Sequence, residues 1–125
     1  MFKIMLKGKI HRAIVNEKNI NYEGSITIDP ELMELAGMEE FEKVQIVDIN
    51  NGKRFETYII KGEYGKREIG LNGAAARMCE LGDQVIIMSY ALYEKNEVPN
   101  PKIVVVDNNN NPKTTKNSET PNTFC

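Results

Sequence analysis

The sequence VQIVDINNGKRFETYII, residues 44–60, carries the clearest local fold signal in this chain. Two segments rich in β-branched and aromatic residues, 44–49 and 54–60, flank the dipeptide Asn51-Gly52. Such segments favour strands, and Asn-Gly between two strands is typical of a tight two-residue turn because both residues tolerate positive φ angles. We therefore predict a β-hairpin with a type I′ turn at Asn51-Gly52.

The segments on both sides of this hairpin have the same character, which predicts a mainly β protein with short helices. Apolar alternation and β-branched runs predict strands over residues 2–7, 9–15, 25–28, 67–71, 84–92 and 102–107. Many short strands with little helix indicate a closed, barrel-like β domain. We expect this single domain to span residues 1–107.

Two helices and a tail complete the prediction. Asp29 is a good N-cap and Pro30 a good first helical residue, so a short helix is expected over 31–36, where Gly37 ends it. Residues 74–81 are good helix formers and predict a second helix. Residues 16–21 are polar and are expected to form a turn. Residues 108–125, rich in Asn, Thr, Lys and Pro, predict a disordered tail.

Composition limits the classes of function. The 125 residues carry 16 basic and 18 acidic side chains, for a net charge of −2, which argues against a nucleic-acid-binding surface. No apolar run is long enough for a membrane span and no signal-peptide pattern opens the chain. Two cysteines and one histidine, far apart, offer no metal-ligand spacing and no disulfide framework. We expect a cytoplasmic protein without a metal or membrane partner.

The tetrapeptide YEGS, residues 22–25, can carry unusual chemistry. If the peptide is strained, the Ser25 hydroxyl can attack the Gly24 carbonyl, since glycine has no Cβ to shield that carbonyl. The resulting N→O acyl shift gives an ester, β-elimination cleaves the chain, and hydrolysis converts the former serine into a pyruvoyl group. An ordinary turn is the simpler interpretation of Gly-Ser taken by itself.

Three further motifs accompany this tetrapeptide in register. They are KIHR at 9–12, NGKRFETY at 51–58 and LNGAAA at 71–76. In this order and spacing the four segments resemble the aspartate 1-decarboxylase family, pyruvoyl-dependent enzymes that make β-alanine for pantothenate synthesis. The resemblance runs from Met1 to about Asp107.

The resemblance implies a double-psi β-barrel assembled as a homotetramer. It also implies self-cleavage between Gly24 and Ser25, giving chains 1–24 and 25–125, and a covalent pyruvoyl cofactor derived from Ser25. The pyruvoyl ketone forms a Schiff base with the amine of L-aspartate and acts as the electron sink for loss of CO2. No external cofactor is required.

The same resemblance assigns roles in catalysis. Tyr58 is the expected proton donor to the carbanion at Cα; a tyrosine pKa of about 10 keeps that proton available at neutral pH. Arg54 and Lys9 are the expected cations for the dianionic substrate, and either can take either carboxylate. The backbone of Gly73, Ala74 and Ala75 and the side chain of Thr57 are expected to contact the substrate.

Processing needs its own residues. The resemblance points to Thr57 as the group that polarises the Gly24 carbonyl and to Asn72 as a holder of the precursor loop. His11 and Tyr22 lie in matched segments and rank below them. Cleavage without help and cleavage with a maturation protein both remain open.

Strand geometry raises one question about these roles. Side chains alternate along a regular strand, so Arg54 and Tyr58 share one face while Thr57 lies on the other. A bulge, a strand end or a site between subunits could bring all three to one site.

Two alternatives use the same residues differently. A serine hydrolase could pair Ser25 with His11, but glycine stands on only one side of Ser25, so the nucleophile-elbow pattern is missing. A non-catalytic small β-barrel could bind a ligand or partner with no chemistry. In that case Lys9, His11 and Arg54 are surface residues and Tyr58 packs against its sheet.

Overall fold

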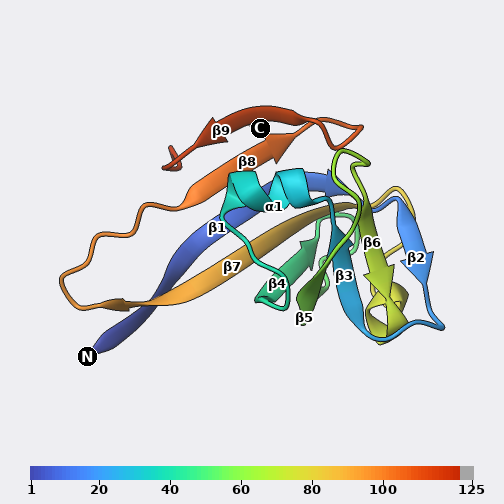
Figure 1. The fold of residues 1–125 in the computed structure, drawn as a ribbon, viewed down its shortest axis with the longest axis horizontal. Helices are drawn as coiled ribbons and strands as arrows, with labels where there is room; N and C mark the ends of the chain where they lie inside the picture. Colours follow the sequence, from blue (N-terminus) through green and yellow to red (C-terminus); the bar gives the residue numbers. More distant parts are fainter. Residues whose placement is uncertain (122–125) are drawn as a thin grey trace.

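The computed structural model of the chain describes residues 1–121, which form nine strands, one α-helix and one short 3₁₀ helix (Figure 1). The elements are β1 (Phe2–Ile14), β2 (Glu17–Asn19), β3 (Ser25–Ile28), α1 (Pro30–Ala36), β4 (Lys43–Asp48), β5 (Arg54–Lys61), β6 (Ile69–Asn72), η1 (Gly73–Arg77), β7 (Gln84–Glu94), β8 (Lys102–Val106) and β9 (Pro112–Lys116). The predicted mainly β class with short helices is confirmed.

The strands close into a barrel. Their order is β2-β6-β3-β5-β4-β7-β1-β8-β9. Strand β7 pairs with β1, and β6 pairs with β2. Because β2 follows β1 after only Val15 and Asn16, this one stretch of chain bridges β7 and β6 and closes the ring of strands. The Asn16 N–H donates to the Ile69 carbonyl at 3.0 Å where β1 passes into β2. The parallel pairs β2–β6 and β3–β5 require crossover connections, in agreement with the double-psi barrel that the family resemblance implies.

The barrel interior is filled by the inward face of each strand. On β4 the buried residues alternate with partly exposed ones, as the period of two requires. Burying each large aliphatic side chain contributes roughly 1.5–3 kcal/mol. The fully buried isoleucines are Ile10, Ile26, Ile28, Ile46, Ile59, Ile69 and Ile87.

Helix α1 lies over the part of the sheet formed by β1 and β8 (Figure 1). Its predicted boundaries are confirmed: the Asp29 side chain accepts from the Glu31 N–H at 2.9 Å, and Gly37 ends the helix with φ +66°. A Cβ on Gly8 of β1 would lie 2.0 Å from the Ala36 carbonyl oxygen, so only glycine lets the helix pack this close.

The hairpin at residues 44–60 forms, but the predicted type I′ turn is wrong. The last β4–β5 pair is Val47 with Arg54, and the Asp48 N–H donates to the Lys53 carbonyl at 2.9 Å, which leaves four residues in the loop. Of the two expected turn residues, only Gly52 has a positive φ, +75°. The Asp48 carboxylate accepts from the Asn50 N–H at 2.8 Å, and this side-chain bond shapes the wider loop.

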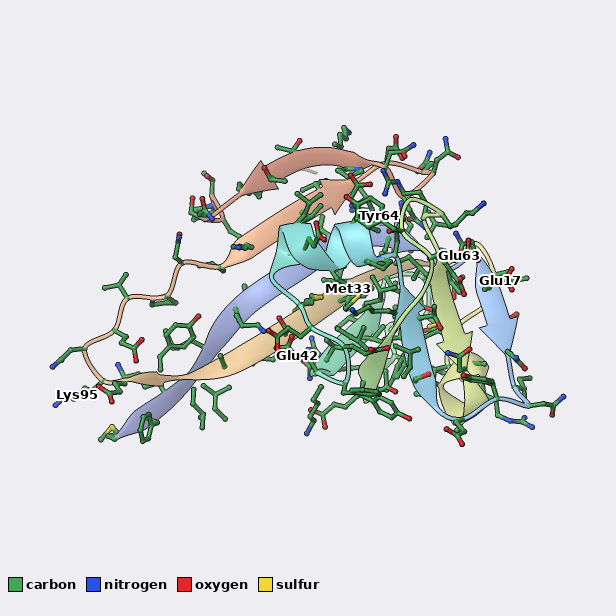
Figure 2. All side chains as sticks on the ribbon, in the orientation of Figure 1. Glu17, Met33, Glu42, Glu63, Tyr64 and Lys95 are labelled. Atoms are coloured by element: carbon green, nitrogen blue, oxygen red, sulfur yellow. The ribbon has the colours of Figure 1, made fainter. Side chains whose placement is uncertain are left out.

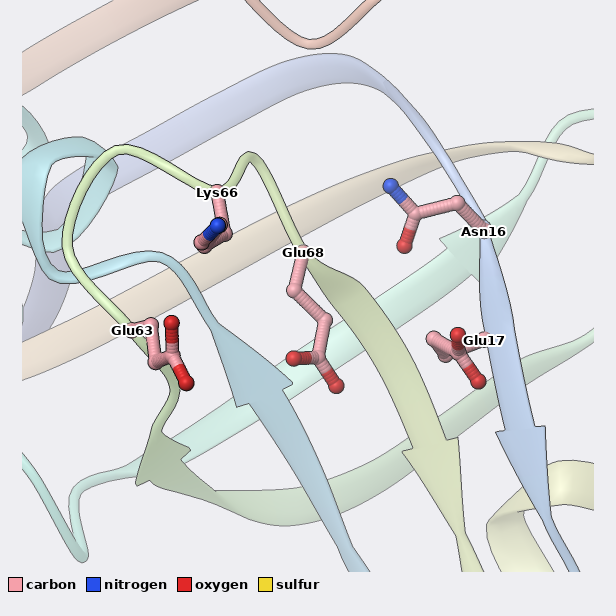
Figure 3. Close-up of a pocket in the computed structure, with 5 residues that line it drawn as sticks. All are labelled: Asn16, Glu17, Glu63, Lys66 and Glu68. Carbon is pink, nitrogen blue, oxygen red and sulfur yellow. The ribbon is translucent and has the colours of Figure 1, made fainter.

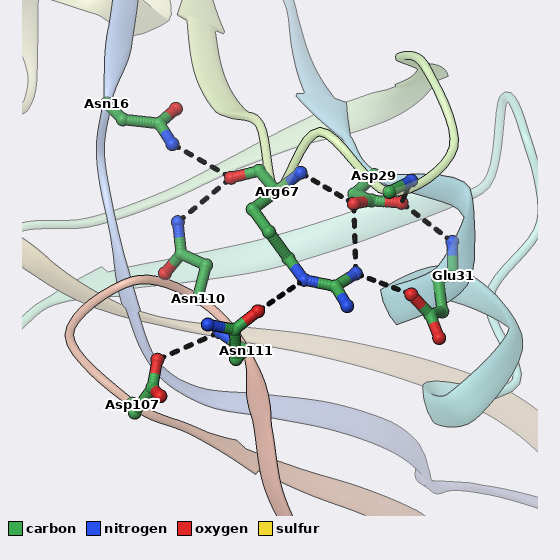
Figure 4. Close-up of polar contacts among 8 residues, drawn as sticks. Asn16, Asp29, Glu31, Arg67, Asp107, Asn110 and Asn111 are labelled. Carbon is green, nitrogen blue, oxygen red and sulfur yellow. Dashed lines mark hydrogen bonds and ion pairs between the residues drawn. The ribbon is translucent and has the colours of Figure 1, made fainter.

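Residues 112–116 form β9, antiparallel to β8, so the expected disordered tail is wrong over this stretch. The anchor is Asn110, which is buried in an αL conformation that asparagine tolerates (φ +61°). Its side chain accepts from the Ile14 N–H at 2.7 Å and donates to the Ile14 carbonyl. It also donates to the Arg67 carbonyl, as Figure 4 shows. Residues 122–125 of the predicted tail lie outside the described residues.

The predicted helix over 74–81 is instead the short 3₁₀ helix η1, Gly73–Arg77. The buried residues of η1 are Gly73 and Ala76, and their spacing of three suits the three-residue turn of a 3₁₀ helix. Burial has therefore overridden the helix propensity of this alanine-rich segment. The expected turn at 16–21 contains the short strand β2. No helix within residues 1–121 has the length and apolarity to cross a bilayer.

Candidate active site

Ser25 is the first residue of β3 and is almost fully buried, whereas Gly24 before it is exposed. Antiparallel pairing places Ser25 opposite Asn72, the last residue of β6. The Asn72 Nδ2 donates to the Ser25 Oγ at 2.9 Å and to the Thr27 Oγ1 at 3.0 Å. A single amide thus holds two hydroxyls on one face of β3.

Gly73 lies against the Gly24 peptide. Its φ is +62°, and a Cβ at this position would lie 2.8 Å from the Gly24 nitrogen, the Gly24 Cα and the Tyr22 carbonyl oxygen. Only a residue without a side chain permits this approach. The fold therefore brings the predicted processing residues Tyr22, Gly24, Ser25 and Asn72 together with Gly73. Ala74 and Ala75 follow in η1, and Ala74 is exposed.

Strand β5 runs beside β3 and carries the next predicted residues. Ile26 pairs with Ile59 and Thr27 with Ile60 in parallel register. Continuing that register backwards places Ser25 level with Tyr58 and Gly24 level with Thr57. Along β5, Arg54 and Tyr58 are exposed and Thr57 is half-buried, so the predicted alternation is confirmed. Pairing with β4 is regular from Arg54 to Tyr58, which leaves no bulge to bring Thr57 to the other face.

Lys9 and His11 lie elsewhere, on β1. Three strands, β5, β4 and β7, separate β1 from β3 in the sheet. His11 occupies the irregular stretch of β1 between Ile10 and Ala13. Burial lowers the pKa of His11, and the nearby cations Lys9 and Arg12 lower it further. Within one chain the structure does not bring Ser25 to His11, so the geometry of a serine hydrolase is absent from the described residues.

The outer face of the sheet links Lys9 to Arg54 through side chains that sequence reasoning missed. Cross-strand pairs run from Lys9 to Met88, then to Gln45 and Glu56, and opposite residues share a face. The Gln45 Oε1 accepts from the Arg54 Nη1 at 2.9 Å and from the Tyr90 hydroxyl at 2.9 Å. The alternation in residues 44–49 could have placed Gln45 on the face of Arg54, but its bonding partners could not be read from the sequence.

A surface hollow of about 410 Å³ adjoins the serine, and Tyr22, Thr27, Asn72 and Glu68 are among the residues that line it. It shares Glu63 and Glu68 with a second hollow of about 490 Å³, shown in Figure 3. Burial, followed by the nearby carboxylates of Glu17 and Glu63, raises the pKa of Glu68. Around the second hollow the carboxylates of Glu17, Glu63 and Glu68 outnumber the Lys66 ammonium, so its negative charge disfavours an anionic ligand.

Among residues 1–121, no three or more His, Cys, Asp or Glu side chains are grouped so as to hold a metal ion. The cysteine in this region, Cys79, is buried, and burial together with the neighbouring carboxylates of Asp48 and Asp83 raises its pKa to about 12. A thiol with such a pKa is not a nucleophile at neutral pH.

The fold and this cluster define a small mixed β-barrel protein in which a buried serine, held by an asparagine, directly follows an exposed glycine packed on a second glycine. Comparison with known proteins makes the class specific. The family model described as aspartate decarboxylase matches residues 1–113. The chain belongs to the aspartate decarboxylase family.

Individual relatives agree with this membership. Aspartate 1-decarboxylase of Kosmotoga olearia is 63% identical over 112 residues, covering 90% of this chain and 97% of the relative. The protein of the same name from Caldicellulosiruptor saccharolyticus is 64% identical over 108 residues, covering 85% and 84%. The one from Thermoanaerobacter pseudethanolicus is 56% identical over 114 residues, covering 90% and 97%.

A computationally designed protein of known crystal structure is similar at a TM-score of 0.44 and 18% identity, over 70% of this chain and 99% of that one. The description of the barrel rests on the strand pairing within this chain, which closes the ring independently of that likeness.

Proposed function

We propose that this chain decarboxylates L-aspartate to β-alanine and CO2, after cleaving itself between Gly24 and Ser25 and converting Ser25 into a pyruvoyl group. Family membership supports the reaction. The observation that carries the self-processing is the Ser25 hydroxyl, buried and bonded to Asn72 at 2.9 Å, beside a Gly24 peptide packed on Gly73.

In this proposal Asn72 holds the Ser25 side chain in one rotamer while the exposed Gly24 carbonyl remains open to attack. Nothing lies within 4 Å of a Cβ built on Gly24, so the space beside the Gly24 Cα is open. Thr57, level with Gly24, is the candidate that polarises the carbonyl. Tyr22 and His11 have lesser roles in processing.

The pyruvoyl ketone supplies an electron sink for the carbanion left by loss of CO2. Tyr58 is level with the serine and on the same face of the sheet, and its phenol holds the proton that must reach Cα. The backbone of Gly73, Ala74 and Ala75 borders the place where the substrate would lie, whereas Thr57 lies on the opposite face of β5 from Tyr58 and would contact the substrate in a site completed between protomers.

Substrate binding requires cations, and Arg54 lies on the same strand face as Tyr58. Lys9 lies on β1, and two strands, β4 and β7, separate β1 from β5, which is too far for Lys9 to share one small substrate with Arg54 in the same chain. We therefore propose that the site is completed between protomers, with Lys9 supplied by a neighbouring copy.

A homotetramer is the assembly that we propose. The long β1–β7 pair extends beyond the barrel as an arm (Figure 1), and its side chains reach into solvent around the labelled Lys95 (Figure 2). Several are apolar, with Phe2 62%, Ile4 72% and Leu92 67% exposed. Such a strip needs a partner surface. A cytoplasmic location completes the proposal, supported by a sequence with two cysteines far apart, Cys79 and Cys125.

The first experiment is the intact mass of the purified, denatured protein. The proposal expects chains 1–24 and 25–125, the larger one lighter by one ammonia than a peptide that begins with serine. Ser25→Ala is expected to abolish both cleavage and β-alanine production. A cleaved, active Ser25→Ala protein would contradict the mechanism.

An uncut wild-type chain that is cleaved after warming or incubation in host lysate would indicate a maturation partner. An uncut chain that stays uncut, with no β-alanine formed, would favour the alternative function, a non-catalytic barrel that binds a ligand or partner. The two outcomes are distinguished by the same mass measurement.

A further inference from the structure

Lys9 is occupied by a carboxylate from the same chain. The Lys9 Nζ lies 2.7 Å from the Oε2 of Glu119 and donates a hydrogen bond to it. The Lys9 side chain is only 15% exposed, whereas that of Glu119 is 51% exposed. The mostly buried cation therefore faces a half-exposed carboxylate that can move into solvent without disturbing the core.

The segment after β9 is held in position, so this contact is not a free end meeting a random partner. Ile103 of β8 pairs with Lys116 of β9, and the Asn117 side chain donates to the Pro101 carbonyl at 3.1 Å. At the other end of β9, Asn110 is bonded to Ile14 and Arg67. Glu119 follows two residues after Asn117 and is thereby delivered to β1.

Glu119 also lies outside the part of the chain that the family shares, because the family match ends at residue 113. Its side chain carries the same functional group as the side chain of aspartate. The hydrogen bond from Lys9 lowers the pKa of Glu119, so the carboxylate is charged at neutral pH. Two carboxylates at one ammonium group repel each other, so a substrate carboxylate binds Lys9 more weakly while Glu119 stays in place.

We propose that Glu119 is an internal competitor for the carboxylate group of the substrate at Lys9, and that it thereby sets the apparent affinity of the enzyme for acidic substrates. This inference rests on the proposed function, in which Lys9 receives one carboxylate of aspartate. Release of Glu119 precedes binding at Lys9, so the competition raises KM and leaves the chemical step unchanged.

The test is Glu119→Gln, with Glu39→Gln as the matched control because Glu39 is an exposed glutamate in the segment after α1. Partly exposed ion pairs contribute little, so we expect KM for aspartate to fall about two- to fivefold in Glu119→Gln. We expect kcat to stay within about twofold, since the residue does not touch the reacting atoms. Glu39→Gln should match the wild type in both constants.

A second readout does not depend on activity. The rate at which acetic anhydride acetylates Lys9, followed by peptide mass spectrometry, should rise in Glu119→Gln and not in Glu39→Gln. If the wild type forms no β-alanine, the proposed function fails while the acetylation rates still test the contact. Unchanged KM together with unchanged acetylation of Lys9 would overturn the inference, as would a KM that rises in Glu119→Gln.

Discussion

The position of the Gly24 peptide depends on the absence of a side chain at Gly73. A Cβ there would lie 2.8 Å from the Gly24 nitrogen and Cα, and φ is +62°, so Gly73→Ala should displace the Gly24 peptide. We expect the variant to remain uncut, and to be less stable by about 1–2 kcal/mol from the αL conformation. Intact mass and urea denaturation measure the two effects.

The control is Gly82→Ala, where φ is +90° and nothing lies within 4 Å of an added Cβ. It has the backbone strain without the collision, so it should lose stability and still be cleaved. Cleavage of Gly73→Ala at the wild-type rate would show that the approach of Gly73 to Gly24 is not needed for processing.

Gln45 is a second residue-scale prediction, because one oxygen accepts from both Arg54 and Tyr90. Gln45→Leu removes the acceptor that holds the guanidinium, so KM for aspartate should rise roughly threefold to tenfold, the range expected for one hydrogen bond. Steady-state kinetics are the measurement. Tyr90→Phe removes only the other donor and should change KM less than about twofold; equal effects in both variants would contradict a positioning role for Gln45.

At the scale of elements, Asp29 joins α1 to the loop before β6. Its carboxylate accepts from the backbone N–H groups of Glu31, Gly65 and Arg67 and pairs with the Arg67 guanidinium at 3.1 Å (Figure 4). Burial by itself opposes ionisation, but these donors outweigh it and hold the pKa of Asp29 below its ordinary value. A lowered carboxyl pKa stabilises the fold above the unfolded pKa of about 3.9, and this stabilisation is lost as pH falls through the lowered folded pKa.

Asp29→Asn should therefore cost about 1–3 kcal/mol of unfolding free energy at pH 7, since it leaves buried donors less well satisfied. The difference from wild type should begin to shrink as pH falls below the unfolded pKa of about 3.9, where the unfolded carboxyl takes up a proton, and should be lost below the lowered folded pKa. Urea denaturation at pH 7 and at pH 3 is the measurement. Glu31→Gln, which removes the more exposed carboxylate beside Arg67, should cost less at pH 7. A loss for Asp29→Asn that is the same at both pH values would contradict the assignment.

The whole molecule presents an apolar arm that a single chain does not cover. If the arm joins protomers, replacing Phe2 and Ile4 together by serine should lower the mass per particle below that of a tetramer, because apolar contact area is lost. Light scattering after size exclusion measures the mass. Tyr64→Ser removes an equally exposed aromatic side chain away from the arm and should leave the assembly intact. A wild-type monomer would refute the assembly.

Several features of this protein could be predicted because they depend on neighbours in the chain. The capping of α1 by Asp29, its end at Gly37 and the alternation of Arg54, Thr57 and Tyr58 all follow from local geometry. The motif at residues 22–25 and the motif at 71–76 were expected at one site, and the pairing of β3 with β6 joins them.

Other features depend on contacts between distant segments, which local pattern does not encode. The polar stretch after residue 107 suggests disorder. However, the Asn110 side-chain amide bonds both the N–H and the carbonyl of Ile14, as a neighbouring strand would, and this anchors β9. The loop at Asn51-Gly52 is wider than expected because the Asp48 side chain competes for its N–H groups.

The sequence by itself determined the strand-rich class, the helix caps and the chemistry available to Gly24 and Ser25, because propensity, capping and functional groups are properties of a residue and its nearest neighbours. Only the tertiary structure decided which groups meet: Asn72 with Ser25, Gln45 with Arg54, and Glu119 with Lys9. Strand register and barrel closure determine these contacts, and both depend on the packing of residues far apart in the chain.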